Sequence, residues 1–156
     1  MTQAADVLQA ARDRGVMIAT AESCTGGLIA GALTEVPGSS DAFDRGFVTY
    51  SNSAKQQMLG VLPDTLTEYG AVSEEVAAQM AAGALRNSDA GIAVSVTGIA
   101  GPGGSEHKPE GRVCFGIAQP YGTQTETVDF GAIGRQNVRA ATVQHALQLL
   151  LDALKD

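Results

Sequence analysis

The chain has 156 residues, of which 44% are apolar and 17% are charged, and its formal net charge is −7. This composition excludes a disordered chain and predicts one globular domain over residues 1–156. Because Lys and Arg form no cluster, and because no signal peptide or membrane-length apolar run occurs, we expect a cytoplasmic protein that binds neither nucleic acid nor membranes. Cys24 and Cys114 are too few for a disulfide scaffold.

Apolar periodicity and turn residues divide the first part of the chain into short elements. The first helix places Ala4, Val7, Leu8 and Ala11 on one stripe. In chain order we expect a helix over 3–14, a buried strand over 16–22, a turn over 23–27, a helix over 27–36, a strand over 46–51 and a short helix over 53–59.

The second part begins with Ser73, a predicted N-cap for a helix with two glutamates in its first turn. We expect that helix over 74–86, strands over 91–97, 112–118 and 123–130, a long Gly/Pro-rich loop over 98–111, and a last helix over 135–154. The last two strands form an antiparallel hairpin around residues 120–122. The alternation of helices and strands predicts a layered α/β fold with helices on both faces of a sheet that is not purely parallel.

The segment TAESCTGG at 20–27 is the strongest local feature, because small nucleophilic side chains and two glycines follow a buried strand and lead into a helix. Unpaired N–H groups at such a helix start can hold an anion or a developing oxyanion. The alternative is an ordinary N-cap serine or threonine with glycines for tight packing. Cys24 is either a thiol nucleophile or a buried neighbour of one.

Two further segments have both a chemical and a structural interpretation. Lys55, at the start of the predicted helix after Tyr50, is either a solvated surface lysine or a desolvated base with a lowered pKa. The glycines of SVTGIAGPGG at 95–104 either allow a ligand to approach the backbone or only shape the loop. A Ser-His-Asp triad would need His107, for which nothing local argues, and His145 is expected to pack in the last helix. We expect no metal site and no cofactor.

Taken together, five strings resemble the C-terminal domain of the competence- and damage-inducible CinA family, which also occurs alone as a nicotinamide-nucleotide amidohydrolase. They are TAESCTGG (20–27), GFVTYSN-AK (46–55), GAVSEEVAAQMA (70–81), SVTGIAGPGG (95–104) and KPEGRV (108–113). The resemblance runs from about residue 4 to residue 152. It implies a three-layer α/β/α sandwich with a mixed, mostly parallel sheet of about five strands, and a homo-oligomer. It also implies hydrolysis of nicotinamide mononucleotide to nicotinate mononucleotide and ammonia.

The resemblance also assigns roles to residues of this chain. Ser23 is the implied nucleophile, Lys55 its base, and Tyr50 and Thr97 fall at active-site positions. We expect the backbone at Cys24, Thr25, Gly26 and Gly27 to hold the oxyanion, and the substrate to contact the loop and two arginines. These substrate-binding residues are Gly98, Gly101, Gly103, Gly104, Arg135 and Arg139.

One departure concerns the start of the last helix, where many family members read Gly-Asp-Arg. Here the matching stretch is Ile133-Gly134-Arg135, without the acid. This change keeps two alternatives open: a nucleotide-binding module that has lost its activity and serves regulation, and a hydrolase that acts on a different amide.

Overall fold

The computed structural model describes residues 2–105 and 107–156. The helices are α1 (Gln3–Arg14), α2 (Leu28–Thr34), α3 (Asn52–Leu59), α4 (Pro63–Tyr69), α5 (Glu74–Arg86) and α6 (Arg135–Lys155), and a short 3₁₀ helix, η1, covers Ser39–Asp41. The strands are β1 (Ile18–Glu22), β2 (Phe43–Val48), β3 (Ile92–Gly98), β4 (Arg112–Gln119) and β5 (Gly122–Asp129).

The five strands form one mixed sheet in the order β2-β1-β3-β4-β5. Strand β1 pairs in parallel with β2 and β3, whereas β4 is antiparallel to both β3 and β5. All strands except β4 therefore run in the same direction, which confirms the predicted mixed, mostly parallel sheet. The carboxyl ends of β1, β2 and β3 meet at one edge, where open α/β sheets usually bind ligands.

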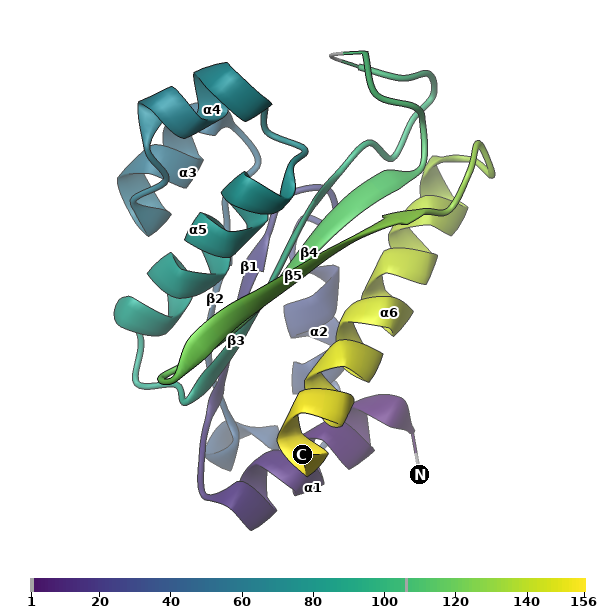
Figure 1. The fold of residues 1–156 in the computed structure, drawn as a ribbon. Coiled ribbons are helices and arrows are strands. Elements are labelled where there is room, and N and C mark those ends of the chain that lie inside the picture. Colours follow the sequence, from purple (N-terminus) through teal and green to yellow (C-terminus); the bar gives the residue numbers. More distant parts are fainter. Residues whose placement is uncertain (1, 106) are drawn as a thin grey trace.

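Helices cover both faces of the sheet, with α1, α2 and α6 on one face and α3, α4 and α5 on the other (Figure 1). The predicted three-layer α/β/α sandwich is confirmed. Ile92, Val94 and Val96 of β3 face the core beneath α1, α2 and α6, while Ala93 faces the core beneath α5. The α5 side of the sheet carries small residues because this helix lies very close. A Cβ on Gly116 would come within 2.7 Å of the Ala77 carbonyl oxygen.

Capping explains why several helices begin where the sequence predicts. The Thr2 side chain accepts a hydrogen bond from Ala5 N at the start of α1, and Ser73 accepts one from Val76 N at the start of α5. Helix α1 ends at Gly15, whose φ of 68° lies in the left-handed region that favours glycine. The four residues expected on the inner stripe of α1 are all buried.

One strand lies elsewhere than predicted, and one helix was not predicted. The strand expected over 46–51 is β2 at Phe43–Val48, so residues 49–51 lie outside it and lead into α3. Helix α4, at Pro63–Tyr69, was not predicted although Pro63 stands in its first turn. The shift of β2 matters for the site, since it leaves carbonyl groups of residues 49 and 50 available to side chains.

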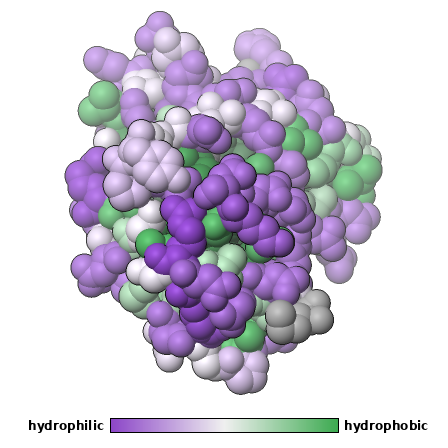
Figure 2. All heavy atoms as spheres, turned by 60° about the horizontal axis from the view of Figure 1, so that its bottom comes forward, coloured by the Kyte–Doolittle hydropathy of each residue, from purple (hydrophilic) through white to green (hydrophobic). Residues whose placement is uncertain are grey.

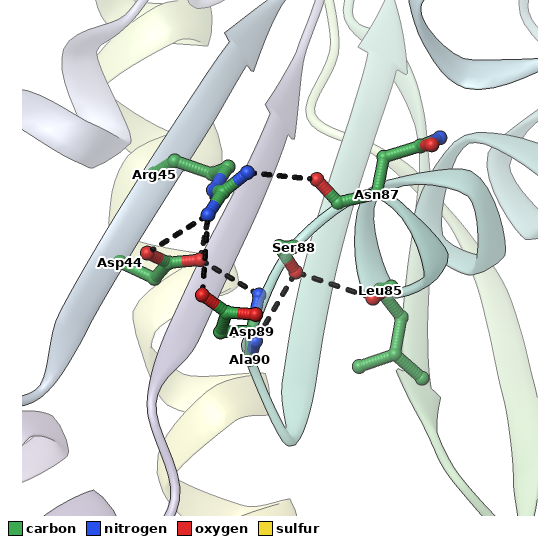
Figure 3. A network of polar contacts seen from close by, with 7 residues as sticks. All are labelled: Asp44, Arg45, Leu85, Asn87, Ser88, Asp89 and Ala90. Carbon is green, nitrogen blue, oxygen red and sulfur yellow. Dashed lines mark hydrogen bonds and ion pairs between the residues drawn. The ribbon is translucent and has the colours of Figure 1, made fainter.

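A polar network joins the start of β2 to the connection between α5 and β3 (Figure 3). Arg45 contacts the carboxylates of Asp44 at 2.8 Å and Asp89 at 3.4 Å, and donates to the Asn87 carbonyl at 3.1 Å. Such exposed ion pairs contribute at most about 1 kcal/mol each. The network lies at the amino ends of the parallel strands, away from the ligand-binding edge.

The end of the molecule that carries both termini is mostly hydrophilic on the face that Figure 2 brings forward. Within residues 2–105 and 107–156, no helix has the length and apolar character that crossing a bilayer requires.

Candidate active site

A cavity of about 370 Å³ opens at the carboxyl ends of β1, β2 and β3. This volume lies in the range of about 300–1,000 Å³ that is usual for small-molecule sites. Its walls come from the turn after β1, the segment leading into α3, the connection between α4 and α5, the loop after β3, and the start of α6. The lining residues are Ser23, Cys24, Tyr50, Asn52, Lys55, Ala71, Val72, Thr97, Gly98, Ile99, Ala100, Gly101, Pro102, Gly103, Gly104, Ser105 and Arg135.

Lys55 and Ser23 meet inside this cavity. The Lys55 side chain runs from α3 toward the end of β1, and its Nζ lies 3.0 Å from Ser23 Oγ. Lys55 is only 1% exposed and Ser23 only 7%. The interpretation of Lys55 as a solvated surface lysine is therefore wrong.

Two main-chain carbonyl groups also contact the lysine. Nζ lies 3.1 Å from the Thr49 oxygen and 3.3 Å from the Tyr50 oxygen. A neutral amine has two N–H donors and one lone pair. With its donors on the two carbonyl groups, the lone pair can face the Ser23 hydroxyl, which is the geometry that a general base requires.

The turn between β1 and α2 is compact and carries Ser23 at its start. Ser23 N donates to Val96 O at 3.1 Å, and Gly26 N donates to Ser23 O at 3.1 Å. Gly26 and Gly27 have φ values of 58° and 105°, which other residues rarely adopt. Neither Cys24 N nor Thr25 N donates to another residue of the described chain.

The N-cap interpretation of this turn is also wrong. Gly27 is the N-cap residue of α2 and makes no side-chain capping bond. The Glu22 carboxylate instead accepts hydrogen bonds from Ile29 N and Ala30 N, while the Ser23 hydroxyl contacts Lys55. Sequence reasoning missed Glu22, because a capping group delivered from the preceding strand has no local sequence signature.

Arg139 lies behind the turn and does not line the cavity. Its Nε donates to Cys24 O at 3.1 Å and its Nη2 to Thr25 O at 3.2 Å. This guanidinium group thus ties α6 to the turn of residues 23–27, called the nucleophile turn below. The contact differs from the substrate contact expected from the sequence.

Arg135, in contrast, does line the cavity. Its guanidinium donates to Gly101 O at 2.6 Å and to the Tyr50 hydroxyl at 2.9 Å, joining the loop after β3 to the segment before α3. Tyr50 is 63% exposed at the mouth. Thr97 is buried, and its hydroxyl donates to Ala71 O at 2.8 Å.

The glycines of the loop 98–104 all line the cavity, and three of them are also required by the packing of the loop. A Cβ on Gly98 would lie 2.6 Å from the Val113 side chain, one on Gly101 2.6 Å from Glu110, and one on Gly104 2.3 Å from the Lys108 carbonyl oxygen. Gly103 has open space around it, with a φ of 81°. The structural interpretation therefore holds for these three glycines, and all four glycines line the cavity.

Neither histidine lines the cavity that contains Ser23 and Lys55. His107 is exposed and does not line the cavity. His145 of α6 packs against Phe115, with ring centroids 4.6 Å apart, and pairs with Glu126. Among the described residues, no group of three or more His, Cys, Asp or Glu side chains is arranged to hold a metal ion.

Cys24 also lines the cavity and carries a nucleophilic thiol. Burial, together with a smaller effect of the nearby Glu22 carboxylate, raises the pKa of its thiol to about 12. The thiolate is the reactive form of cysteine, so Cys24 is protonated and unreactive at neutral pH.

We therefore expect Cys24→Ala to retain most of the activity of the wild-type protein. Iodoacetamide should alkylate Cys24 slowly at pH 7 and faster only as the pH rises toward 12, as mass spectrometry of the intact protein can measure. A Cys24→Ala variant that is inactive, beside a Ser23→Ala variant that is active, would reassign the nucleophile.

Comparison with known proteins places this geometry in context. The model of the CinA C-terminal domain family matches residues 1–154. The chain is 50% identical over 143 residues to the nicotinamide-nucleotide amidohydrolase PncC of Escherichia coli K12, covering 91% of this chain and 87% of that protein. It is 54% identical over 146 residues to a CinA-like protein of Chlorobium phaeobacteroides, covering 90% of this chain. The chain spans only 35% of the length of that CinA-like relative.

Solved structures agree closely with the fold. The competence/damage inducible protein CihA from Agrobacterium tumefaciens is 52% identical, with a TM-score of 0.88 over 97% of this chain and 96% of that one. The competence damage-inducible protein A from Klebsiella pneumoniae is 38% identical, with a TM-score of 0.94 over 98% of this chain and 95% of that one.

Proposed function

This chain belongs to the CinA C-terminal domain family, and from that premise we propose that it is a metal-independent amidohydrolase that converts nicotinamide mononucleotide and water to nicotinate mononucleotide and ammonia. The observation that carries the proposal is the buried contact of 3.0 Å between Lys55 Nζ and Ser23 Oγ. The substrate follows from the 50% identity to a nicotinamide-nucleotide amidohydrolase.

In the first step, Ser23 Oγ attacks the carboxamide carbon while neutral Lys55 takes the hydroxyl proton. The pyridinium ring of the substrate withdraws electrons and eases this attack. The tetrahedral intermediate carries its negative charge on the former carbonyl oxygen. We assign the stabilisation of this oxyanion to Cys24 N and Thr25 N, neither of which donates to another residue of the described chain.

Gly26, also expected as an oxyanion contact, has a different role in this scheme, whereas the Gly27 amide donates to no other described residue and stays a proposed contact. The Gly26 amide donates to Ser23 O, a bond that would have to break before it could serve the oxyanion. Both glycines have positive φ and give the turn its shape.

In the second step, protonated Lys55 returns the proton to the substrate nitrogen, the carbon–nitrogen bond breaks, and ammonia leaves an ester on Ser23. Water then attacks this ester with Lys55 again as the base, which releases nicotinate mononucleotide and restores the serine. Thr49 O and Tyr50 O keep Nζ in place throughout. Thr97 orients the connection between α4 and α5 through its bond to Ala71 O.

The ribose phosphate is assigned to the mouth of the cavity, where Arg135 and the loop 98–104 lie. Arg135 is the one arginine among the lining residues, and Gly103 leaves room beside the backbone. Binding a phosphate there would exchange or share the present bonds from Arg135 to Gly101 O and the Tyr50 hydroxyl.

We expect Arg135→Ala to raise KM for nicotinamide mononucleotide about tenfold or more, because a charge-assisted hydrogen bond contributes roughly 1.5–3 kcal/mol. Tyr50→Phe is the matched control, since it removes only the hydroxyl partner of Arg135 and keeps the guanidinium in place. Steady-state kinetics on both variants measure the effect. An unchanged KM in Arg135→Ala would move the phosphate contact to the loop 98–104.

The decisive test of the activity is a product assay on the purified protein. Incubation with nicotinamide mononucleotide in excess chelator should release ammonia and nicotinate mononucleotide in equal amounts. Binding of the nucleotide without ammonia release would favour the regulatory module. Ammonia from glutamine or another amide, but not from the nucleotide, would favour the hydrolase with a different substrate. A loss of activity in chelator that zinc or manganese restores would contradict the Ser23/Lys55 scheme.

A further inference from the structure

Glu22 is a buried carboxylate that the proposed reaction does not use. It is the last residue of β1, directly precedes Ser23, and is only 1% exposed. Burying a carboxylate is costly unless hydrogen bonds or charges compensate. The groups that donate hydrogen bonds to Glu22 therefore show which part of the structure the buried carboxylate stabilises.

Within the described chain, every group that donates a hydrogen bond to this carboxylate belongs to the nucleophile turn or to α2. It accepts hydrogen bonds from Thr25 Oγ1 at 2.5 Å, Ile29 N at 2.9 Å and Ala30 N at 3.0 Å. Helix α2 has no acidic residue in its first turn and no side-chain cap of its own. Glu22 thus satisfies N–H groups at the start of this helix from outside it, and fixes Thr25 in the same contact.

The main chain of Glu22 connects to the segment that holds the lysine. Thr49 N donates to Glu22 O at 2.9 Å, and Thr49 O is one of the carbonyl groups that contact Lys55 Nζ. One residue therefore joins the turn that presents Ser23 to the segment that orients Lys55.

We propose that Glu22 is a positioning residue, whose carboxylate holds the turn 23–27 so that Ser23 Oγ faces Lys55 Nζ and the Cys24 and Thr25 amides face the developing oxyanion. The turn contains two glycines with positive φ and gains little rigidity from its own sequence. Arg139 also holds it, through the Cys24 and Thr25 carbonyl groups. Any other conformation of the turn would leave the buried carboxylate with fewer donors. This inference rests on the proposed Ser23/Lys55 dyad.

The test uses two readouts on the full chain with Glu22→Gln, which keeps the shape of the side chain but turns one acceptor into a donor. With nicotinamide mononucleotide, kcat should fall by about tenfold to a hundredfold, as expected for a small misplacement of a catalytic group. KM should stay nearly constant, since Glu22 does not line the cavity. The rate at which a fluorophosphonate probe labels Ser23 should fall by a similar factor, and this readout needs no assumption about the substrate.

A matched pair at Thr25 isolates the hydroxyl contact. Thr25→Ser keeps a donor to Glu22, whereas Thr25→Val loses that donor and should label more slowly than Thr25→Ser. Glu74→Gln is the control for removal of a carboxylate in general. Glu74 also accepts bonds from two threonine hydroxyl groups, Thr125 and Thr127, but it lies outside the cavity, and its variant should label at the wild-type rate.

The outcomes separate this proposal from the proposed function. A folded Glu22→Gln variant with a lower melting temperature but unchanged labelling and kcat would overturn the positioning role. If Glu22→Gln does not fold, wild-type labelling of Thr25→Val would overturn it, as would a wild-type protein whose Ser23 is not labelled. If the wild-type protein leaves nicotinamide mononucleotide intact while Glu22→Gln slows labelling, the substrate assignment fails and the positioning role stands.

Discussion

Replacing either Ser23 or Lys55 with alanine is expected to lower kcat by about 10³-fold or more while the fold survives. Loss of a general base alone costs about 10²–10⁴-fold, and loss of the nucleophile removes the covalent route. The double variant should be little worse than either single variant, because a nucleophile and its base act as one unit. Single-turnover measurements of ammonia release, with circular dichroism to verify folding, test this expectation.

Two controls sharpen the result. Lys55→Met keeps an unbranched apolar stem in the buried space, so a loss of activity equal to that of Lys55→Ala identifies the amine as the required group. Lys155→Ala removes an exposed lysine at the end of α6 and should be fully active. Near-normal turnover in Lys55→Ala would require another base.

The dependence of kcat/KM on pH tests the same mechanism. Free lysine titrates at about pH 10.4, and burial disfavours its charged form. The base is active only when neutral, so kcat/KM should rise with pH and reach a plateau once Lys55 is deprotonated. A rise that moves or disappears in a His107→Ala variant would contradict the assignment to the lysine.

How far the sequence predicts this fold depends on how local each signal is. Helix α1 is predicted with its boundaries from its apolar stripe, and the structure shows that the N-cap at Thr2 and Gly15 at its end agree with that stripe. Strand β2 is misplaced because it is an edge strand with Asp44 and Arg45 near its start. Its polar start hides the strand, whereas the β-favouring Thr49 and Tyr50 extend the apparent one.

The site follows the same division. The motif around Ser23 and the lysine at position 55 are recognisable, but the spacing of 32 residues between them does not reveal their contact. Only the family resemblance predicts that pairing before the fold is known. The roles of Glu22 and Arg139 depend on how β1 and α6 approach one turn, which is a tertiary property without a sequence signature.

Removing the phosphate from the substrate should lower kcat/KM by orders of magnitude. The reacting amide is expected beside Ser23 and Lys55 at the base of the cavity, while the phosphate is expected at the mouth beside Arg135. Contacts to a remote group contribute to catalysis when they orient the reacting group in the transition state. The kcat/KM for nicotinamide mononucleotide should therefore exceed that for nicotinamide riboside, and both values should exceed that for free nicotinamide.

Comparing the three substrates separates the phosphate from the ribose and from the charged ring. The riboside keeps the pyridinium, so the ratio of nucleotide to riboside measures the phosphate alone. The Arg135→Ala variant should reduce this ratio sharply while changing the activity on the riboside little, because the deleted guanidinium has no phosphate to bind there. Equal kcat/KM values for nucleotide and riboside in the wild-type protein would contradict a phosphate site at the mouth. A ratio that survives in Arg135→Ala would instead assign the phosphate to the loop 98–104.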